Sequence, residues 1–387
     1  MKKNLFLMGL IALGMSTAFI ACSNDDDDDK KDIDIENAAD LDYSSDYGEQ
    51  WANYMTVVSG LLKTDATTLY NDWAQSFNGG ASYATLFKSH NNDTYESAIN
   101  CVETIFDGCA DIASEVGSAK IGDPYNLYVS GNTTEALYAV ESWYSWHSRD
   151  DYSNNIRSIR NAYYGSRNGQ VNANSLSAAL AKVNAALDTE AKEKIQAAIQ
   201  AIQAIPQPFR NNINSTEAKN AMEVCGDLED FITNQLKPYF QQNINDATTL
   251  DPIIAQYVDG VVVPTYKELM DANTALDNAV KAFKANPSNT AFDACANAWL
   301  AAREPWESSE AFLFGPVADK GLDPNMDSWP LDQERIAQIL MSQDFTDLNW
   351  SGEYDEDNEM IAAKQEVRGF HTLEFLIFKD GKARTVK

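Results

Sequence analysis

The sequence predicts an all-α protein made of two packed antiparallel four-helix-bundle-like domains. Three observations predict this fold class. Apolar residues recur at the three- and four-residue spacing of amphipathic helices along most of the chain, whereas alternation of apolar and polar residues is scarce. Prolines and glycines separate these segments at intervals that fit helical hairpins. Helices joined by short links pack as antiparallel neighbours. The helical segments are numerous enough for two bundles of about four helices each.

The composition excludes several classes of protein. The chain has 387 residues, of which 29 are Lys or Arg and 58 are Asp or Glu, so its formal net charge is −29. Such an acidic chain is not expected to bind nucleic acid, because counterion release requires clustered basic residues. A hydrophobic fraction of 44% is typical of a globular protein and excludes disorder throughout. With three His and no C-x-x-C pair among five Cys, any metal centre has to rely on carboxylates.

Residues 1–21 have the pattern of a secretory signal peptide. Lys2 and Lys3 precede an apolar stretch that is shorter than the roughly 20 residues a helix needs to span a membrane. A small residue then precedes Cys22, and this boundary resembles the lipobox of bacterial lipoproteins. We therefore expect cleavage before Cys22, lipidation of its thiol, and attachment to the membrane only through this lipid anchor.

Residues 22–41 are predicted to be an acidic tether. Five consecutive aspartates, Asp25–Asp29, cannot bury apolar surface and should stay solvated. The run also resembles the acidic export signal of surface lipoproteins in Bacteroides-type bacteria. A plain tether and an export signal require the same composition. We therefore expect a protein that is anchored at the outer membrane, on its periplasmic side or at the cell surface.

The helical pattern starts at Tyr47. In the first segment Trp51, Tyr54, Val58 and Leu62 form one apolar stripe. Later segments have stripes of the same kind. These include Leu180, Val183 and Leu187, then Ile195 and Ile202, Cys225 and Leu236, Tyr266 and Phe283, and Phe292 and Trp299.

Two breaks divide the later helices. Ile205–Phe209 contains two prolines, and Asn286–Ser288 contains one proline and a serine that can cap the next helix. From these breaks and the helix count we predict a first helical bundle half over residues 42–225 and a second over residues 226–387.

The segment Gly369–Phe378 places two ionisable residues in an apolar seam. On a helix, His371 and Glu374 share a face with Val367 and Phe378. A buried carboxylate is unfavourable unless it is paired, hydrogen-bonded or bound to a metal, so Glu374 needs a partner. The spacing of three lets both side chains reach one ion, as the Glu-x-x-His pairs of di-iron bundles do. The alternative is a structural hydrogen bond between His371 and Glu374.

A second helix shows a similar pattern. Arg303 and Glu310 fall on the seam that also contains Trp299 and Trp306. If Arg303 and Glu310 are buried among these aromatic rings, they lose the water that stabilises their charges. Each charge then needs a close partner in the protein. Pro305 should kink this helix, since proline lacks the backbone donor and crowds the preceding turn.

The segment Glu141–Asp151 is predicted to be a third helix, with a polar stripe. The stripe contains Glu141, Ser145, Ser148 and Asp151, while the aromatic residues lie elsewhere on the helix. Taken alone, this segment is explained better by a solvated face than by a site.

Together these motifs resemble the imelysin family of bacterial envelope proteins. Gly369–Glu374 matches the family's G-x-H-x-x-E signature, Ala302–Phe312 its A-R-x-x-[YW]-x-x-[ST]-E-A-F helix, and Ser328–Asp332 its W-P-L-D segment. Glu141–Asp151 and Ile205–Phe209 resemble the other half of the family's sequence. In most imelysins the half with G-x-H-x-x-E comes first, so this chain resembles a circularly permuted member.

The resemblance implies two four-helix-bundle-like domains with the motif near their junction, and an association with iron uptake. Relatives with H-x-x-E bind metal in the periplasm. The founding member was described as a metallopeptidase. A hydrolytic zinc site normally uses three protein ligands and a general base, as in H-E-x-x-H, and this motif is absent from the sequence. We therefore expect no catalytic residue, and a peptidase is the less favoured alternative.

The main hypothesis is a protein that binds iron, another divalent metal ion or a metal-containing ligand, together with an envelope transport partner. The predicted metal ligands are His371, Glu374 and Glu310. Asp332 or Glu141 would complete an oxygen-rich shell, and Arg303 would orient a carboxylate. The other predicted supporting residues are Asp151, Trp306 and Gly369. The alternative is a module for a different ligand or a protein partner, in which His371 and Glu374 form only a structural pair.

Overall fold

The computed structural model describes residues 41–350 and 352–387. The predicted signal peptide, the lipidated Cys22 and the tether up to residue 40 lie outside the described residues. Within the described part, helices dominate and the only strands are β1 (Phe378–Lys379) and β2 (Lys382–Ala383), which pair antiparallel. The predicted all-α class is confirmed. None of the helices searched in this part is long and apolar enough to cross a membrane.

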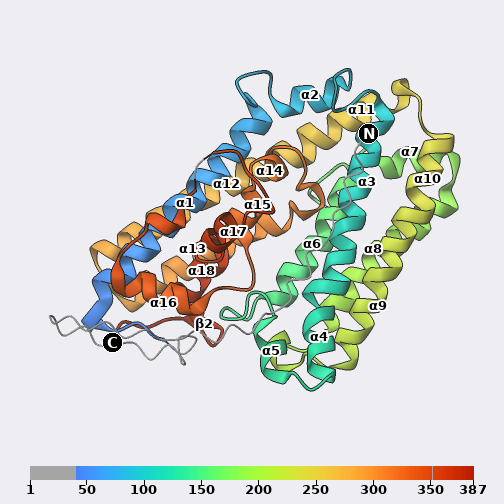
Figure 1. Ribbon diagram of the computed structural model, residues 1–387. Helices are drawn as coiled ribbons and strands as arrows, with labels where there is room; N and C mark the ends of the chain where they lie inside the picture. The colour runs from blue at the N-terminus through green and yellow to red at the C-terminus, as the bar shows by residue number, and fades with distance from the viewer. Residues whose placement is uncertain (1–40, 351) are drawn as a thin grey trace. The chain divides into compact units, whose positions relative to one another are not determined.

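The long helices form two groups. The first group contains α1 (Gly48–Ala74), α12 (Val263–Ala285) and α13 (Asn289–Glu307), and the shorter α18 (Gly369–Ile377) packs with it. The second contains α3 (Ala98–Glu115), α6 (Ser148–Tyr164), α8 (Ala185–Ala204) and α9 (Thr216–Phe231). In Figure 1 the blue α1 runs beside the orange α12, so the first long helix packs with helices from the end of the chain.

Shorter helices and turns complete the fold. The short α-helices are α2 (Tyr83–Ser89), α4 (Gly122–Val129), α5 (Thr133–Tyr138), α7 (Leu176–Val183), α10 (Lys237–Asn243), α11 (Ala247–Tyr257), α14 (Pro316–Asp319), α15 (Leu322–Asp327), α16 (Gln333–Ser342) and α17 (Glu359–Gln365). Three π-helical turns directly follow α3, α9 and α11, namely η3 (Val116–Lys120), η5 (Ile232–Leu236) and η6 (Val258–Val262). The 3₁₀ helices are η2 (Ser45–Tyr47), η4 (Phe209–Asn211), η7 (Glu310–Phe312) and η8 (Thr346–Leu348).

The described residues all belong to one compact unit. The boundary predicted between residues 225 and 226 falls inside α9, and the division into two halves stays a prediction. The core is continuous and rich in large aromatic side chains, with Trp51, Trp73, Trp299 and Trp306 fully buried. These tryptophans therefore supply much of the apolar area that stabilises the fold.

Most of the predicted apolar stripes are the buried faces of the helices. The stripe Leu180–Leu187 is an exception, because α7 ends at Val183, which is exposed, and Leu187 lies on α8. Trp51, Tyr54, Val58 and Leu62 are buried on α1. The predicted serine cap is also present, since Ser288 Oγ accepts a hydrogen bond from the backbone N–H of Ala291 at 3.2 Å. Periodicity and capping therefore predict the long helices correctly.

Two local predictions are wrong. The helix with Arg303 ends at Glu307, so Glu310 lies on the separate 3₁₀ helix η7 rather than on the same seam. Pro305 lies in its last turn, where a missing backbone donor favours an end. The segment Glu141–His147 is an irregular turn and not a helix, and α6 begins only at Ser148.

Candidate functional site

The predicted His371 and Glu374 lie on α18, which is buried along its whole length. His371 Nδ1 is 3.1 Å from Glu374 Oε2, so the spacing of three does bring the two side chains together. The other carboxylate oxygen of Glu374 accepts hydrogen bonds from the backbone N–H groups of Tyr144 at 3.0 Å and Ser145 at 2.7 Å. Glu374 thus has partners for both oxygens, and it ties α18 to the irregular turn before α6.

Gly369 allows α18 to start beside α15. Its φ of +87° lies in the left-handed region, and a Cβ there would be 2.5 Å from the carbonyl oxygen of Met326. Glycine is therefore required for both conformation and close approach. This contact places Asp327, the next residue of α15, beside the first turns of α18.

The second ring nitrogen of His371 contacts a carboxylate that sequence reasoning missed. His371 Nε2 is 3.1 Å from Asp327 Oδ1. Burial and the nearby Arg303 lower the pKa of His371, but Asp327 and Glu374 outweigh them and raise it to about 9. The raised pKa favours the imidazolium form at neutral pH, in which His371 bridges two carboxylates, and Arg303 Nη2 also lies 3.3 Å from Nε2.

Arg303 is the fully buried cation at the centre of the site. Its guanidinium contacts Glu307 Oε1 at 2.5 Å, Asp151 Oδ2 at 3.6 Å and, most closely, Asp327. Trp306 Nε1 donates to the other oxygen of Asp327 at 2.7 Å. Arg303 and Trp306 therefore fix the orientation of Asp327. Burial raises the pKa of Asp327, but Arg303 and His371 outweigh it and hold that pKa well below its usual range.

Asp151 is almost completely buried, so the solvated face predicted for its segment is wrong. Its carboxylate accepts from Ser142 and contacts His147 Nδ1 at 2.7 Å. Burial lowers the pKa of His147, but Asp151 outweighs burial and raises it to about 9. The positive φ of Ser142, +49°, belongs to the turn that brings Ser142 to Asp151.

A cavity of about 230 Å³ lies beside Asp327. Its ionisable lining residues are Glu115, Lys120, Glu141, Glu310, Asp323 and Asp327. Three carboxylates, those of Glu307, Glu310 and Asp327, each offer an oxygen within 4.8 Å of the other two. Oxygens that share one divalent ion at 2.0–2.6 Å, the usual range, are separated by such distances. We call Glu307, Glu310 and Asp327 the carboxylate cluster.

Negative charge exceeds positive charge in and around this cavity. Burial raises the pKa of Glu307 to about 8 although Arg303 opposes it, and burial also raises the pKa of Glu310 well above its usual value. Burial and Asp327 raise the pKa of Asp323 to about 7. Without a further cation, the raised pKa values favour protonated Glu307 and Glu310 at neutral pH, and Asp323 is about half protonated. A bound divalent cation would displace those protons and neutralise the charges directly.

Lys120 is the lysine that lines the acidic cavity. It lies on the π-helical turn η3, and its Nζ contacts Glu141 at 2.9 Å and Glu115 at 3.4 Å. Burial lowers the pKa of Lys120, but Glu141 and Glu115 outweigh burial and raise it well above the usual value. The ammonium is therefore charged and offsets part of the carboxylate excess.

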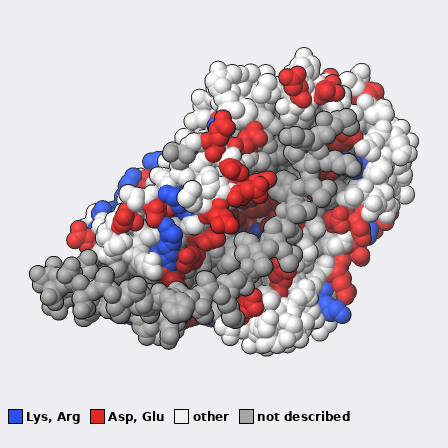
Figure 2. Space-filling view, viewed as in Figure 1, with Lys and Arg blue, Asp and Glu red and all other residues white. Residues whose placement is uncertain are grey.

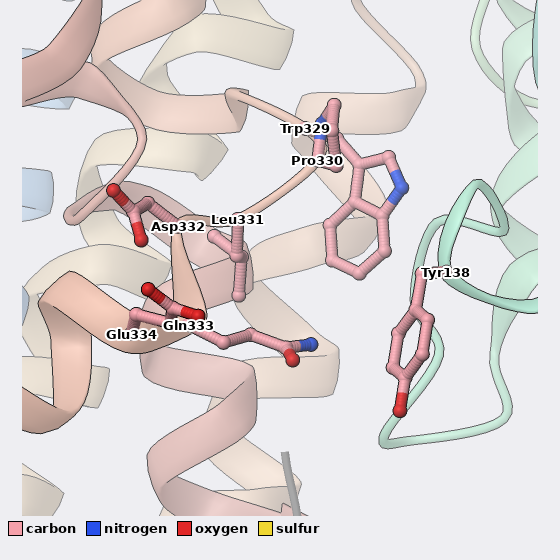
Figure 3. A pocket seen from close by; sticks show the side chains of 7 residues that line it. All are labelled: Tyr138, Trp329, Pro330, Leu331, Asp332, Gln333 and Glu334. Atoms are coloured by element: carbon pink, nitrogen blue, oxygen red, sulfur yellow. The ribbon is translucent and has the colours of Figure 1, made fainter. Parts of the chain in front are cut away.

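Asp332 lies apart from the carboxylate cluster. It caps α16, where its Oδ1 accepts from the backbone N–H of Arg335 at 2.9 Å. It lines a different cavity of about 270 Å³, shown in Figure 3, in which Trp329 faces Tyr138 across the opening. Trp329 also lines the acidic cavity, and its ring packs edge-on against His371 with centroids 4.8 Å apart. The two cavities are thus neighbours that share Trp329.

Sequence reasoning missed several residues of the site. Glu307 follows Arg303 by four positions on a helix, and this spacing is a signal that could have found it. Asp327 stands just before the W-P-L-D segment, but nothing in its local sequence indicates burial. Glu115 ends α3, a helix of the other group, and Lys120 lies on the following turn η3. The sequence around them contains no motif. Only the packing of distant segments brings them to Asp327.

The fold and the site define an all-α protein in which buried carboxylates surround an H-x-x-E helix. The chain belongs to the imelysin family, since the model of that family matches residues 26–234 and 262–387. The predicted resemblance is therefore confirmed. Acidic side chains outnumber basic ones on the face seen in Figure 2, in accord with the net charge of −29.

Two relatives are similar to this chain. An imelysin peptidase from Bacteroides ovatus, known from a crystal structure, is 60% identical, with a TM-score of 0.88 over 90% of this chain and 100% of that one. Iron-regulated protein A of Synechococcus elongatus is 30% identical over 154 residues, which are 40% of this chain and 34% of that protein. The matched region thus spans about a third of the length of this curated relative.

Proposed function

We propose that this protein is a lipid-anchored envelope protein of imelysin type that binds a divalent cation, with iron as the main candidate, in the service of iron uptake. The observation that supports this most strongly is the carboxylate cluster. Its three oxygens lie within 4.8 Å of one another beside a cavity with an excess of negative charge. A buried group of carboxylates with too few cations is stabilised by a metal ion.

The chemistry of the cluster favours a hard cation. Carboxylate oxygens are the ligands that suit such ions, and soft thiolate ligands are excluded because all four described cysteines lie outside this cavity. Iron is preferred within this group because a relative bears the name iron-regulated protein A. The ion would exchange with protons on Glu307 and Glu310, so binding should weaken at low pH.

In this proposal His371 and Glu374 act through other residues. Both nitrogens of His371 contact carboxylates, and Glu374 accepts two backbone hydrogen bonds. His371 would orient Asp327, and Glu310 would be the member of the predicted ligand set that touches the ion. That His371 and Glu374 themselves bind the metal stays a prediction from the sequence. The metal titration described below also tests it.

Titration calorimetry of metal-free protein tests the proposal. We expect one site per chain for Fe²⁺ under anaerobic conditions, with Mn²⁺ and Zn²⁺ as comparison ions. Glu310→Gln should abolish binding, and His371→Gln should weaken it about 10- to 100-fold if His371 only orients a ligand. Asp332→Asn is the matched control, because asparagine also caps helices and Asp332 lies outside the acidic cavity. Absence of binding, or equal binding by Glu310→Gln, would refute the proposal.

A second candidate function has one specific observation in its favour. The two backbone hydrogen bonds to Glu374 explain its burial without a metal. In that case the cavities beside Trp329 would bind a different ligand or a protein partner, and His371–Glu374 would be a structural pair. Unaltered metal content in Glu310→Gln and Glu374→Gln variants, with reduced thermal stability only in the latter, would favour this candidate.

The anchoring and location are proposals of the same kind. We propose that Cys22 is lipidated and that the protein sits at the outer membrane, on its periplasmic side or at the cell surface, near an envelope transport partner. Metabolic labelling with a radioactive fatty acid should mark the wild type and not Cys22→Ala. Protease accessibility on intact cells then distinguishes the two faces of the membrane. Labelling of Cys22→Ala equal to that of the wild type would contradict anchoring at Cys22.

A further inference from the structure

A third cavity, of about 830 Å³, is larger than either cavity beside Trp329. It is lined by residues of α1, of α15, of the segment between η8 and α17, and by Arg368 just before α18. Cavities of a few hundred to about 1,000 Å³ are typical of small-molecule sites. We call it the Arg368 cavity.

An incompletely bonded ion pair lies in the wall of this cavity. Arg368 is 2% exposed and contacts Asp65, and its Nη1 donates to the Leu348 carbonyl at 2.9 Å and to Asn349 Oδ1 at 3.1 Å. The buried Nε of Arg368 and one carboxylate oxygen of Asp65 have no hydrogen-bond partner in the described part of the chain. Burial raises the pKa of Asp65 to about 6, so the pair is not fully compensated by its own contacts.

Two asparagines leave donors available at the same cavity. Asn325 Oδ1 accepts hydrogen bonds from Trp350 Nε1 and Gln365 Nε2, both at 3.0 Å, and Asn349 Oδ1 accepts from Arg368. Both amide oxygens are therefore occupied, which fixes the orientation of each amide group. Their NH₂ groups have no partner among the described residues and remain available to a ligand.

Two aromatic rings complete the cavity. The rings of Trp350 and Tyr354 lie 5.6 Å apart at an interplanar angle of 41°. Trp350 is held by its bond to Asn325. Tyr354 packs over Gly321, where a Cβ would come within 2.3 Å of the ring. The rings therefore have defined positions before any ligand arrives, which reduces the entropy lost on binding.

The charges of the lining disfavour an anionic ligand. Asp65, Asp319 and Glu353 oppose Lys320 and Arg368, and both cations already contact carboxylates, Lys320 with Asp72 at 2.5 Å. A neutral ligand rich in hydroxyl groups satisfies this lining, because each hydroxyl can accept from an amide and donate to a carboxylate. The apolar face of a sugar ring can also pack on an aromatic ring.

We propose that the Arg368 cavity binds a neutral saccharide. Trp350 and Tyr354 provide the packing surface, Asn325 and Asn349 the donors, and Asp65 the acceptor. The site is separate from the carboxylate cluster, since α15 directs Asp323 and Asp327 to the acidic cavity and Asn325 to this one. Failure of metal binding would therefore leave this proposal unaffected.

Saturation-transfer NMR on the intact protein tests it. The probes are glucose, galactose, mannose, N-acetylglucosamine, maltose and lactose, with glucuronate and citrate as anionic comparisons. We expect saturable binding of at least one neutral sugar, weakened about tenfold or more by Trp350→Ala. Tyr128→Ala is the control, because this half-buried aromatic residue lines none of the three cavities, and it should bind as the wild type does.

Three results would overturn the proposal. These are no binding by any neutral sugar of the panel, equal binding by Trp350→Ala and the wild type, and tighter binding of citrate or glucuronate than of every neutral sugar. If Trp350→Ala does not fold, Trp350→Phe and Tyr354→Leu replace it. Of these, Trp350→Phe should retain most of the affinity and Tyr354→Leu should lose it. The reverse order would also contradict the proposed packing surface.

Discussion

Glu374 is the residue that connects the family motif to the rest of the site. Its carboxylate binds His371 on its own helix and two backbone N–H groups of the turn at Tyr144 and Ser145. His371 and Tyr144 are buried and Ser145 is half-buried. Loss of the Glu374 carboxylate would therefore leave buried N–H donors without an acceptor. An unpaired buried donor lowers the stability of the fold by more than the net contribution of an average hydrogen bond.

We predict that Glu374→Ala lowers the free energy of unfolding by about 3 kcal/mol, because it removes a charged acceptor of several hydrogen bonds. Glu374→Gln should lose clearly less, since its carbonyl oxygen can still accept from the backbone. Urea unfolding followed by circular dichroism measures both. The exposed Glu359→Ala is the control and should change stability by less than about 0.5 kcal/mol. Equal losses for Gln and Ala would show that the backbone bonds contribute little.

The histidine and the raised carboxyl groups give a pH dependence of definite sign. The pKa of His371 is raised from 6.5 to about 9, so its stabilising contribution is complete below pH 6.5 and is lost as the pH rises to 9. The pKa of Glu307 is raised to about 8, so the folded state keeps a proton that the unfolded chain has lost above about pH 4.5. Both groups therefore destabilise the metal-free fold as the pH rises.

We predict that the melting temperature of the metal-free protein falls between pH 6.5 and pH 9. Differential scanning fluorimetry across this range measures the change. His371→Gln should reduce the slope above pH 6.5, because this variant has no proton to lose there. A melting temperature that rises over the same interval would contradict the assignment of His371 as an imidazolium.

Among the elements, α18 depends on its first residue. Gly369 has a φ of +87° and touches the carbonyl of Met326 on α15. The long helices were predictable because their burial follows the 3.6-residue period of the sequence. The turn at Glu141–His147 was not, because its shape depends on a hydrogen bond to Asp151 on the following helix and on two to Glu374, which is distant in the sequence. The local sequence offers no sign of the contact with Glu374.

We predict that Gly369→Ala lowers the free energy of unfolding by about 3 kcal/mol, as the sum of backbone strain and a steric clash. Gly131→Ala is the matched control, because Gly131 has a φ of +97° but nothing within 4 Å of an added Cβ. That variant should lose only about 1 kcal/mol from strain. Guanidinium unfolding measures both losses. Equal values would mean that α15 can move away from α18.

Across the whole molecule, the site depends on contacts between the two groups of long helices. Asn155 on α6 bonds to Glu307 on α13, and Lys120, just after α3, lines the same cavity as Glu310 and Asp327. A cation in the carboxylate cluster would add to these contacts only in the folded state. Binding that is confined to the folded state raises its stability by mass action.

We predict that Fe²⁺ or Mn²⁺ at 100 times its dissociation constant raises the free energy of unfolding by about 2.7 kcal/mol. Thermal scans with and without the ion, at fixed pH and protein concentration, measure the effect. The gain should disappear in Asp327→Asn and Glu310→Gln and persist in Asp332→Asn. An equal gain in all four proteins would show that the ion binds elsewhere, for example at the acidic surface.

The sequence by itself determined the all-α class, the long helices, the family and the contact between His371 and Glu374. The class, the helices and this contact depend on short-range periodicity, and the family depends on short motifs. A single chain reveals both. The carboxylate cluster and its counter-charges were decided only by the tertiary structure. Glu307, Asp327 and Lys120 come from three separate segments, and only the spacing of Glu307 from Arg303 is a local signal. Their pKa values and their chemistry arise from burial beside one another, which only the packed fold produces.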